Sequence, residues 1–365
     1  MDNQVKVRDE IRKIERNFEF MRTALAILIA LVIILVLVFF VSDDPLDAVE
    51  QLFLGPLSSL RRFGTVIETM IPLTFTGLAI SITFSSNRFN LISDSTFQFG
   101  GIVAIFIALT SPFSPLVTII MILIASAIVG GALGFVPAYL QERFNANVLV
   151  NSLMLNYVIG HLANYILNNV VRDPQSSALQ SYPLPEGVNL GELVPRTRIH
   201  AGLIIVLVIV VIAYIVIKKT RWGYKLRVTG QNESFAKYSG INVPMVTILA
   251  QVVGAGIAGL GGAVEILGIY DTYMWTASPG YGFDGVIIAT LARNNPAFVP
   301  LAAFFLAYIR TGADIMNRST DVPAEIVSIV QAVIIILIAA QAFLSNWKQK
   351  RIIKVSQKYD TKEVA

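Results

Sequence analysis

The sequence lacks cysteine altogether, and its 365 residues include only two histidines and 14% charged side chains. Without cysteine the chain can form neither a disulfide nor a thiolate metal site. Soluble domains usually carry about 25% charged residues. The shortage of charge, together with 55% hydrophobic residues, therefore indicates an integral membrane protein and argues against a soluble one.

Motifs for the common catalytic chemistries are also missing. There is no G-x-x-x-x-G-K-[ST] motif, so ATP binding through a P-loop is not expected. Neither H-E-x-x-H nor G-x-S-x-G occurs, and His161 lacks visible partners, so we interpret it as structural. An intramembrane enzyme is therefore disfavoured, and we expect no metal and no cofactor.

Long apolar stretches dominate the chain. A membrane span needs about 20 largely apolar residues, and we expect ten membrane segments. They lie roughly at residues 23–41, 66–84, 95–110, 115–140, 147–168, 199–217, 245–269, 283–292, 295–310 and 325–345. Two of these, 95–110 and 283–292, are short and could be re-entrant. The predicted fold class is all-α, a polytopic integral membrane protein with about ten transmembrane or re-entrant helices.

The distribution of basic residues predicts an orientation. With the N-terminus inside, 21 Lys and Arg fall on the inner side and seven on the outer side, where we counted Arg310 in a loop. This bias places both termini in the cytoplasm. It also explains the net charge of +4 without nucleic-acid binding. We expect a cytoplasmic N-terminal helix (1–22), a transmembrane domain (23–345) and a basic cytoplasmic tail (346–365).

Several polar residues lie inside the expected spans, where burying them is costly. Asp94 and Glu265 favour a role in a pathway, whereas Asn151 and Asn156 fit a pathway or interhelical hydrogen bonds equally well. The glycine-rich stretch GAGIAGLGG (254–262) sits in an apolar segment, and its spacing predicts close helix packing. The aromatic residues of 270–285 fit an interfacial belt or a stacking surface for a flat solute.

One compact basic segment, residues 218–244, interrupts the apolar sequence. Asn232 is a good helix N-cap and Gly240 a good helix stop, so NESFAKYSG predicts a short helix in a cytoplasmic loop. By itself this pattern is also explained by surface exposure.

Together with its neighbours, this segment is more specific. RWGYKLRVTGQNESFAKYSGINVP (221–244) resembles the cytoplasmic coupling segment of ABC importer permeases of the ribose and branched-chain amino acid type. Within that type it is most similar to the nucleoside permeases that work with basic-membrane-protein-like lipoproteins. Four further stretches of the chain also resemble the family, and they occur in the family's order. They are FN (89–90), MLNYV (154–158), GAGIAGLGGAVEILG (254–268) and GYGFDGVIIATLARNNP (280–296).

The resemblance implies a permease subunit of the bacterial plasma membrane, in which a short helix docks into a separate cytoplasmic ABC ATPase. It also implies a second permease subunit, a related chain in a heterodimer, and a substrate-binding lipoprotein outside. Nucleosides are the implied solute, with a sugar or a branched-chain amino acid as the alternative. An ion-coupled secondary transporter is a rival of another class, although only Asp94 and Glu265 could serve it.

The resemblance and the polar residues together give two sets of candidate residues. The ATPase-coupling set is Asn232, Glu233, Ser234, Phe235, Ala236, Lys237 and Tyr238. The substrate-path set is Asn90, Asp94, Thr96, Asn151, Asn156 and Glu265. In FNLISDSTFQFG (89–100) the chain departs from the family's F-N-I-G-x-E-G-Q pattern, so a different solute or gate is expected at those positions.

Overall fold

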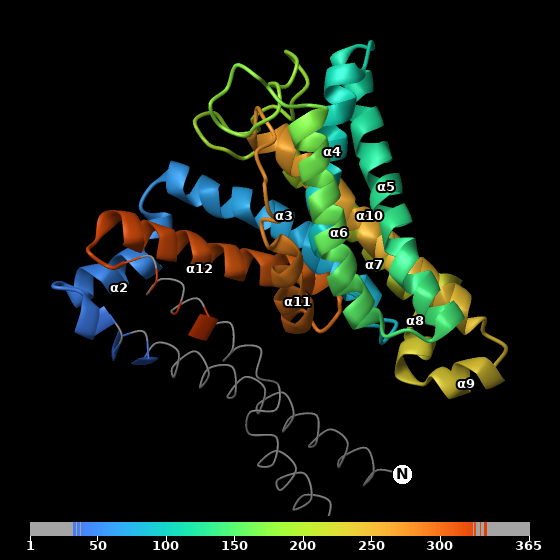
Figure 1. The fold of residues 1–365 in the computed structure, drawn as a ribbon. Coiled ribbons are helices and arrows are strands. Elements are labelled where there is room, and N and C mark those ends of the chain that lie inside the picture. Colours follow the sequence, from blue (N-terminus) through green and yellow to red (C-terminus); the bar gives the residue numbers. More distant parts are fainter. Residues whose placement is uncertain are drawn as a thin grey trace, which may run out of the picture. The chain divides into compact units, whose positions relative to one another are not determined.

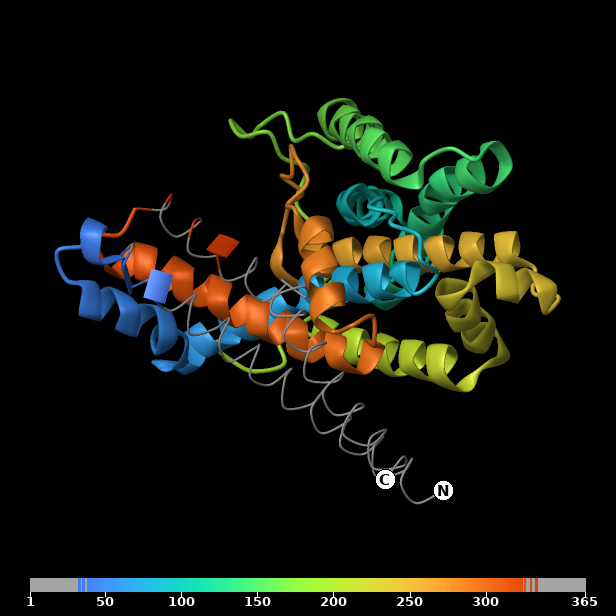
Figure 2. The ribbon, with the colours of Figure 1, turned by 90° about the horizontal axis from the view of Figure 1, so that it is seen from below.

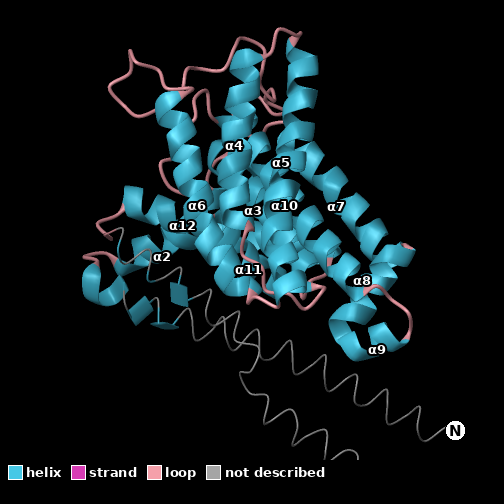
Figure 3. Ribbon diagram, turned by 45° about the vertical axis from the view of Figure 1, so that its right-hand side comes forward, coloured by secondary structure: helices cyan, strands magenta, loops and turns pink. Residues whose placement is uncertain are grey.

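The computed structural model describes residues 38–323 and the isolated positions 32, 33, 35, 36, 325, 329, 332 and 333. The expected N-terminal helix (1–22), the basic tail (346–365) and most of the first and tenth membrane segments lie outside the described residues. Within the described part there is no strand, only isolated bridges between Arg172 and Ser181 and between Glu192 and His200. The all-α prediction is confirmed for this part of the chain (Figure 3).

Eight of the described helices overlap the expected apolar segments. They are α2 (Pro45–Phe53), α3 (Leu60–Phe84), α4 (Ser93–Thr110), α5 (Pro115–Phe144), α6 (Val148–Asn169), α7 (Gly202–Lys219), α8 (Arg221–Gln231), α9 (Glu233–Tyr238), α10 (Val243–Ile269), α11 (Tyr281–Leu291) and α12 (Val299–Ser319). Short 3₁₀ turns, η1 (Gly55–Leu57) and η2 (Pro296–Phe298), precede α3 and α12.

Six helices of the described part are long and apolar enough to cross a membrane: α3, α4, α5, α7, α10 and α12 with its preceding turn. The polytopic membrane character is therefore confirmed, but the count of about ten is not. Helix α6 is long enough, yet its asparagines dilute its apolar character. Helix α11 has 11 residues and is about 16 Å long, roughly half the thickness of a bilayer's hydrocarbon core.

The chain forms two compact units, residues 55–311 and the two flanking segments. In the flanking unit, Asp321 joins the residues before α2 to those after α12. Its carboxylate accepts hydrogen bonds from Ser42 Oγ at 2.6 Å and from the Asp43 amide at 2.7 Å.

In the unit of residues 55–311, α3 and α10 form the centre. They lie between α7 on one side and α4, α5 and α6 on the other (Figures 1 and 2). The 170–201 loop lies at one end of this bundle and the α8–α9 pair at the opposite end (Figure 1). The two ends therefore present different surfaces, one a long loop and the other a compact helical element.

Glycines set the closest helix contacts. A Cβ on Gly259 would lie 2.6 Å from the Ser126 carbonyl oxygen, and one on Gly256 would lie 2.8 Å from that of Ala127. Backbone of α5 therefore occupies the space that side chains on α10 would need. The prediction that GAGIAGLGG packs helices is confirmed.

Candidate functional site

The short helix predicted around NESFAKYSG is present as α9. The Asn232 side chain accepts a hydrogen bond from the Phe235 amide at 2.9 Å, which is a helix N-cap. Gly240 has a φ of +75°, and the Ile241 and Gly240 amides donate to the carbonyls of Ala236 and Lys237. This pair of bonds is a Schellman C-cap. Both predicted helix boundaries are thus confirmed, and the caps define a rigid six-residue element.

Helix α9 divides into an inner and an outer face. Ala236 is fully buried against the rest of the chain, whereas the Phe235 side chain is 57% exposed and that of Tyr238 is 92% exposed. Ser234 and Lys237 are also exposed. An exposed aromatic pair on a rigid, capped helix is a surface suited to a partner protein.

Helix α8 holds α9 against the ends of two spans. Its N-cap is Thr220, which accepts a hydrogen bond from the Gly223 amide at 3.2 Å. A Cβ on Gly223 would collide with the last carbonyls of α7, and one on Gly230 would collide with the Ser85 carbonyl at the end of α3. These two close approaches explain the glycines of RWG and VTG.

Arg88 connects α9 to the rest of the bundle. Its guanidinium lies 3.2 Å from the Glu233 carboxylate and 3.3 Å from that of Glu142 at the end of α5. Glu142 also accepts a hydrogen bond from the Thr247 hydroxyl of α10 at 2.8 Å. Hydrogen bonding from Lys237 and the neighbouring Arg88 hold the pKa of Glu233 below its ordinary value, so this carboxylate stays ionised at neutral pH.

The residues after Arg88 form the next connection. The Asn90 amide donates to the Gln251 side chain of α10 at 2.6 Å. Asn156 of α6 donates to the Leu91 carbonyl at 3.0 Å and accepts from the Ser95 hydroxyl at 2.7 Å. The segment between α3 and α4 is therefore joined to α6 and α10 by side-chain hydrogen bonds.

Asp94, in the first turn of α4, reaches the start of α11. Its carboxylate accepts a hydrogen bond from the Gly282 amide at 3.1 Å, and its carbonyl accepts one from the Ser278 hydroxyl at 3.4 Å. A Cβ on Gly282 would collide with the Asp94 backbone. A carboxylate at a helix N-terminus is favourable because it meets unsatisfied amides and the positive end of the dipole.

Helix α11 carries a carboxylate of its own, Asp284. Asp284 pairs with Arg310 of α12 at 2.5 Å. The prediction that Arg310 lies in an outer loop is wrong, because α12 runs on to Ser319 and places Arg310 within the helix. The Asp284 carboxylate makes this position favourable for Arg310, since it neutralises the arginine charge.

The remaining path candidates differ in their surroundings. Glu265 is buried and forms a side-chain hydrogen bond with Tyr281, whose ring centroid lies 5.3 Å from that of Phe97 on α4. Thr96 is fully buried, and among the described residues neither its hydroxyl nor the Asn151 amide nitrogen has a hydrogen-bond partner.

The structure therefore brings Asn90, Asp94, Thr96 and Asn156 together around residues 89–96 and joins Glu265 to them through Tyr281 and Phe97. Asn151 does not join this network.

The aromatic segment 270–285 was expected to form an interfacial belt or a stacking surface for a flat solute. Both expectations are wrong for its central residues. Tyr273 is fully buried and Trp275 is 8% exposed. The Trp275 ring stacks on Phe97 with centroids 5.7 Å apart. These rings form part of the core, because the segment after α10 turns back against α4.

Sequence reasoning missed several members of these networks. Arg88, Glu142 and Gln251 were not singled out. Glu68 lies within the expected segment 66–84 but was not singled out, although it is buried in α3 and pairs with Arg198 at 3.3 Å. A lone Gln in an uncharged apolar run is a signal that could have identified Gln251.

Within the described part of the chain, no group of three or more His, Asp or Glu side chains is placed to hold a metal ion. The described contacts instead form a continuous connection between α9 and α11. Hydrogen bonds and ion pairs lead from α9 through Arg88 and residues 90–94 to α11.

Comparison with known proteins gives one family match. The family described as "Branched-chain amino acid transport system / permease component" matches residues 63–339.

Individual relatives match over most of their length. The guanosine ABC transporter permease protein NupP of Bacillus subtilis is 30% identical over 80% of this chain and 84% of its own. The nucleoside ABC transporter permease protein NupB of Lactococcus lactis is 29% identical over 86% and 89%. A glucose ABC transporter permease protein of Haloferax volcanii is 28% identical over 84% and 83%.

Proposed function

Because the chain belongs to the permease-component family of branched-chain amino acid transport systems, a family of transport subunits and not of enzymes, we propose that it forms the membrane path of an ATP-driven importer and couples to its ATPase through residues 232–238. ATP hydrolysis takes place on a separate cytoplasmic subunit, since this sequence has no P-loop.

The observation that carries the proposal is the construction of α9. It is capped at both ends, exposes Phe235 and Tyr238, and is bound by Glu233 to Arg88. A partner that moves α9 therefore pulls on the segment that leads into α4.

The mechanism follows from the same contacts. In this proposal, closure of the ATPase moves α9, and Arg88 passes the motion to residues 89–94. Asp94 then moves relative to the start of α11, where its hydrogen bond to Gly282 is made. Alternating access needs two arrangements around a central site. The central site would be lined or gated by the path residues, which are Asn90, Asp94, Thr96, Asn151, Asn156 and Glu265.

Nucleosides are the proposed solute. Two relatives that match nearly their full length carry guanosine and nucleoside in their names. The glucose permease relative supports a sugar as the second candidate. Both classes are uncharged and rich in hydroxyl groups, which suits a path of amide, hydroxyl and carboxylate side chains that donate or accept hydrogen bonds.

The complete transporter is proposed to contain a second, related permease subunit, a cytoplasmic ATPase and an external binding lipoprotein, in a bacterial plasma membrane. Both termini are proposed to be cytoplasmic, with a helix at 1–22, a membrane domain at 23–345 and a basic tail at 346–365. Helices α6 and α11 and the two terminal segments would complete ten membrane segments.

A purification tests this assembly. The tagged chain is isolated from native membranes in mild detergent, and co-purifying chains are identified by mass spectrometry. We expect a P-loop ATPase and a second permease. Uptake of labelled guanosine, challenged with unlabelled adenosine or glucose, then separates the two solute classes. Reproducible recovery of the folded chain alone, with uptake that persists when the ATPase gene is deleted, would instead favour an ion-coupled transporter.

A further inference from the structure

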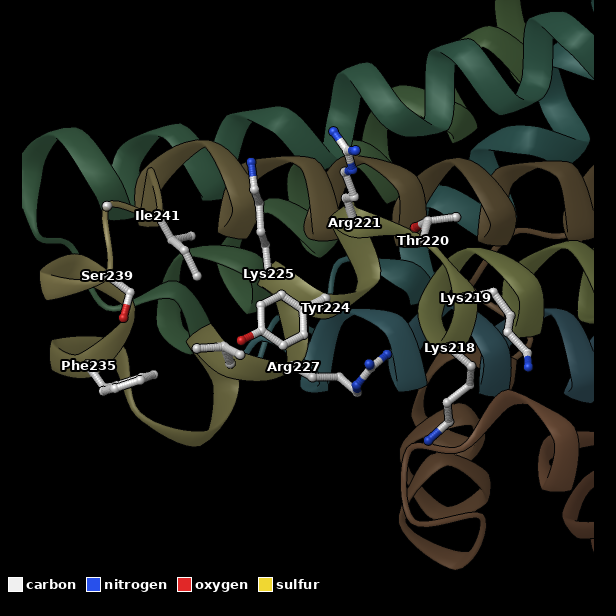
Figure 4. Close-up of a pocket in the computed structure, with 12 residues that line it drawn as sticks. Lys218, Lys219, Thr220, Arg221, Tyr224, Lys225, Arg227, Phe235, Ser239 and Ile241 are labelled. Atoms are coloured by element: carbon white, nitrogen blue, oxygen red, sulfur yellow. The ribbon is translucent and has the colours of Figure 1, made fainter.

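A basic groove lies beside α9, on the side formed by α8. It has a volume of about 660 Å³ and is bounded by the last turn of α7, by α8 and by the residues that follow α9 (Figure 4). Its basic lining residues are Lys218, Lys219, Arg221, Lys225 and Arg227.

The positive charge of this groove is not balanced locally. No Asp or Glu is among its lining residues, and none of the five basic side chains forms an ion pair with another described residue. Glu233, the nearest carboxylate along the chain, is already bound to Arg88 and Lys237. Five cations around one groove attract an anion.

One of the five has a structural role. Arg227 donates a hydrogen bond to the Ile217 carbonyl at the end of α7. The other four side chains, Lys218, Lys219, Arg221 and Lys225, are exposed and remain available to a ligand.

The position of the groove indicates the source of the anion. Helix α7 is an apolar membrane-spanning helix, and Lys218 and Lys219 form its last turn, so the groove lies where this span leaves the bilayer. Apolar and aromatic side chains share its lining: Val228, Phe235, Ile241 and Tyr224. Such a mixture suits a molecule with a charged head and an apolar remainder.

We propose that this groove binds the headgroup of an anionic phospholipid. Its phosphate would lie near Lys218 and Lys219, with the glycerol region against Tyr224 and Val228. Lys225, whose side chain points to the other side of the groove in Figure 4, would attract the anion from a longer distance. A free phosphate would satisfy the same cations, but it would gain nothing from the apolar wall or from the end of the span. The bound lipid would anchor α8 at the membrane surface beside α9. Of the coupling residues 232–238, Phe235 alone is among the groove's lining residues.

The test compares lipid binding by two variants of the full chain. K218Q/K219Q/K225Q neutralises the groove. R61Q/R172Q/R196Q removes the same charge from exposed arginines at the opposite end of the bundle. Binding of phosphatidylglycerol to purified protein in zwitterionic detergent is measured by native mass spectrometry, with phosphatidylcholine as the neutral reference.

We expect the groove variant to lose phosphatidylglycerol affinity on the order of 100-fold, from about fivefold for each basic side chain. The control variant should bind like the wild type, and so should K218R/K219R/K225R, because it keeps the charge. Single changes, K218Q and K219Q, should each lose about fivefold, which keeps the test valid if the triple variant folds poorly.

Three results would overturn the proposal. One is equal phosphatidylglycerol binding by the wild type and the groove variant. Another is full displacement of the lipid by millimolar inorganic phosphate, which would assign the groove to a soluble anion. The third is loss of ATPase co-purification from the groove variant with lipid binding intact, which would assign the groove to the protein partner.

Discussion

At the scale of single residues, position 282 has room only for glycine. Gly282 lies so close to Asp94 that any Cβ would collide with the Asp94 backbone. The hydrogen bond from the Gly282 amide to the Asp94 carboxylate depends on that approach. This explains physically why glycine stands at the third position of GYGFDG.

Gly282→Ala is therefore expected to separate α4 from α11. Overpacking of this kind costs about 1–3 kcal/mol, so the apparent unfolding temperature in detergent should fall and uptake should decrease. Gly191→Ala is the matched control, because a Cβ at Gly191 meets no atom within 4 Å. Equal stability of the two variants would contradict the assigned contact.

His200 gives a pH dependence at the same scale. Burial lowers its pKa from 6.5 to about 4, and its Nδ1 accepts a hydrogen bond from the Gly202 amide at 3.2 Å. The unfolded chain therefore binds the proton more readily than the folded chain. The stabilising effect is complete above pH 6.5 and is lost as the pH falls towards 4, by about 3 kcal/mol at most.

The measurement for His200 is the apparent unfolding temperature in detergent between pH 7.5 and 4.5. The wild type should lose stability across this range. His200→Asn keeps an acceptor near the Gly202 amide but does not titrate there, so its profile should be flatter. Parallel profiles would show that His200 is not the group responsible.

At the scale of elements, α9 is predicted well from the sequence because its determinants are local. Asn232 and Gly240 act on amides and carbonyls a few residues away, and capping chemistry is readable from residue type. The apolar spans are equally readable, since their length and lack of charge are sequence properties.

Other elements depend on contacts between distant residues and could not be predicted. Tyr273 and Trp275 looked interfacial, but the chain after α10 folds back and buries them against α4. Arg310 looked like a loop residue because its partner, Asp284, is 26 positions away. The ion pair that makes this helical position favourable is not visible until the fold brings α11 to α12.

Ala236→Pro tests α9 as an element. Proline removes the hydrogen bond from the Ala236 amide to the Asn232 carbonyl and costs about 3 kcal/mol within a helix. Uptake should be lost while membrane insertion stays normal, because α9 lies outside the spans. Leu116→Pro is the control, since proline is tolerated in a first turn and Leu116 is an exposed residue in the first turn of α5, outside the coupling set. Normal uptake by Ala236→Pro would refute the coupling role.

At the scale of the whole molecule, the connection from α9 to α11 is continuous but not uniform. Arg88 joins α9 to α5 by charge, whereas residues 90–94 join α6, α10 and α11 through neutral and backbone hydrogen bonds. Arg88 is the one step on this route that contacts α9 directly through an ion pair. Loss of the Arg88 ion pair should therefore interrupt the transfer of motion from α9 to the spans.

A double-mutant cycle examines that step. Arg88→Gln and Glu233→Gln should each reduce labelled-solute uptake in cells at equal protein levels, and the double variant should be no worse than the more severe single variant, because both changes break one interaction. Arg88→Gln combined with Asp173→Asn, in the loop at the other end of the bundle, should instead give additive losses. Additive losses for the Arg88 and Glu233 changes would mean that α9 acts on the spans by another route, for which its packing through the buried Ala236 is the alternative contact.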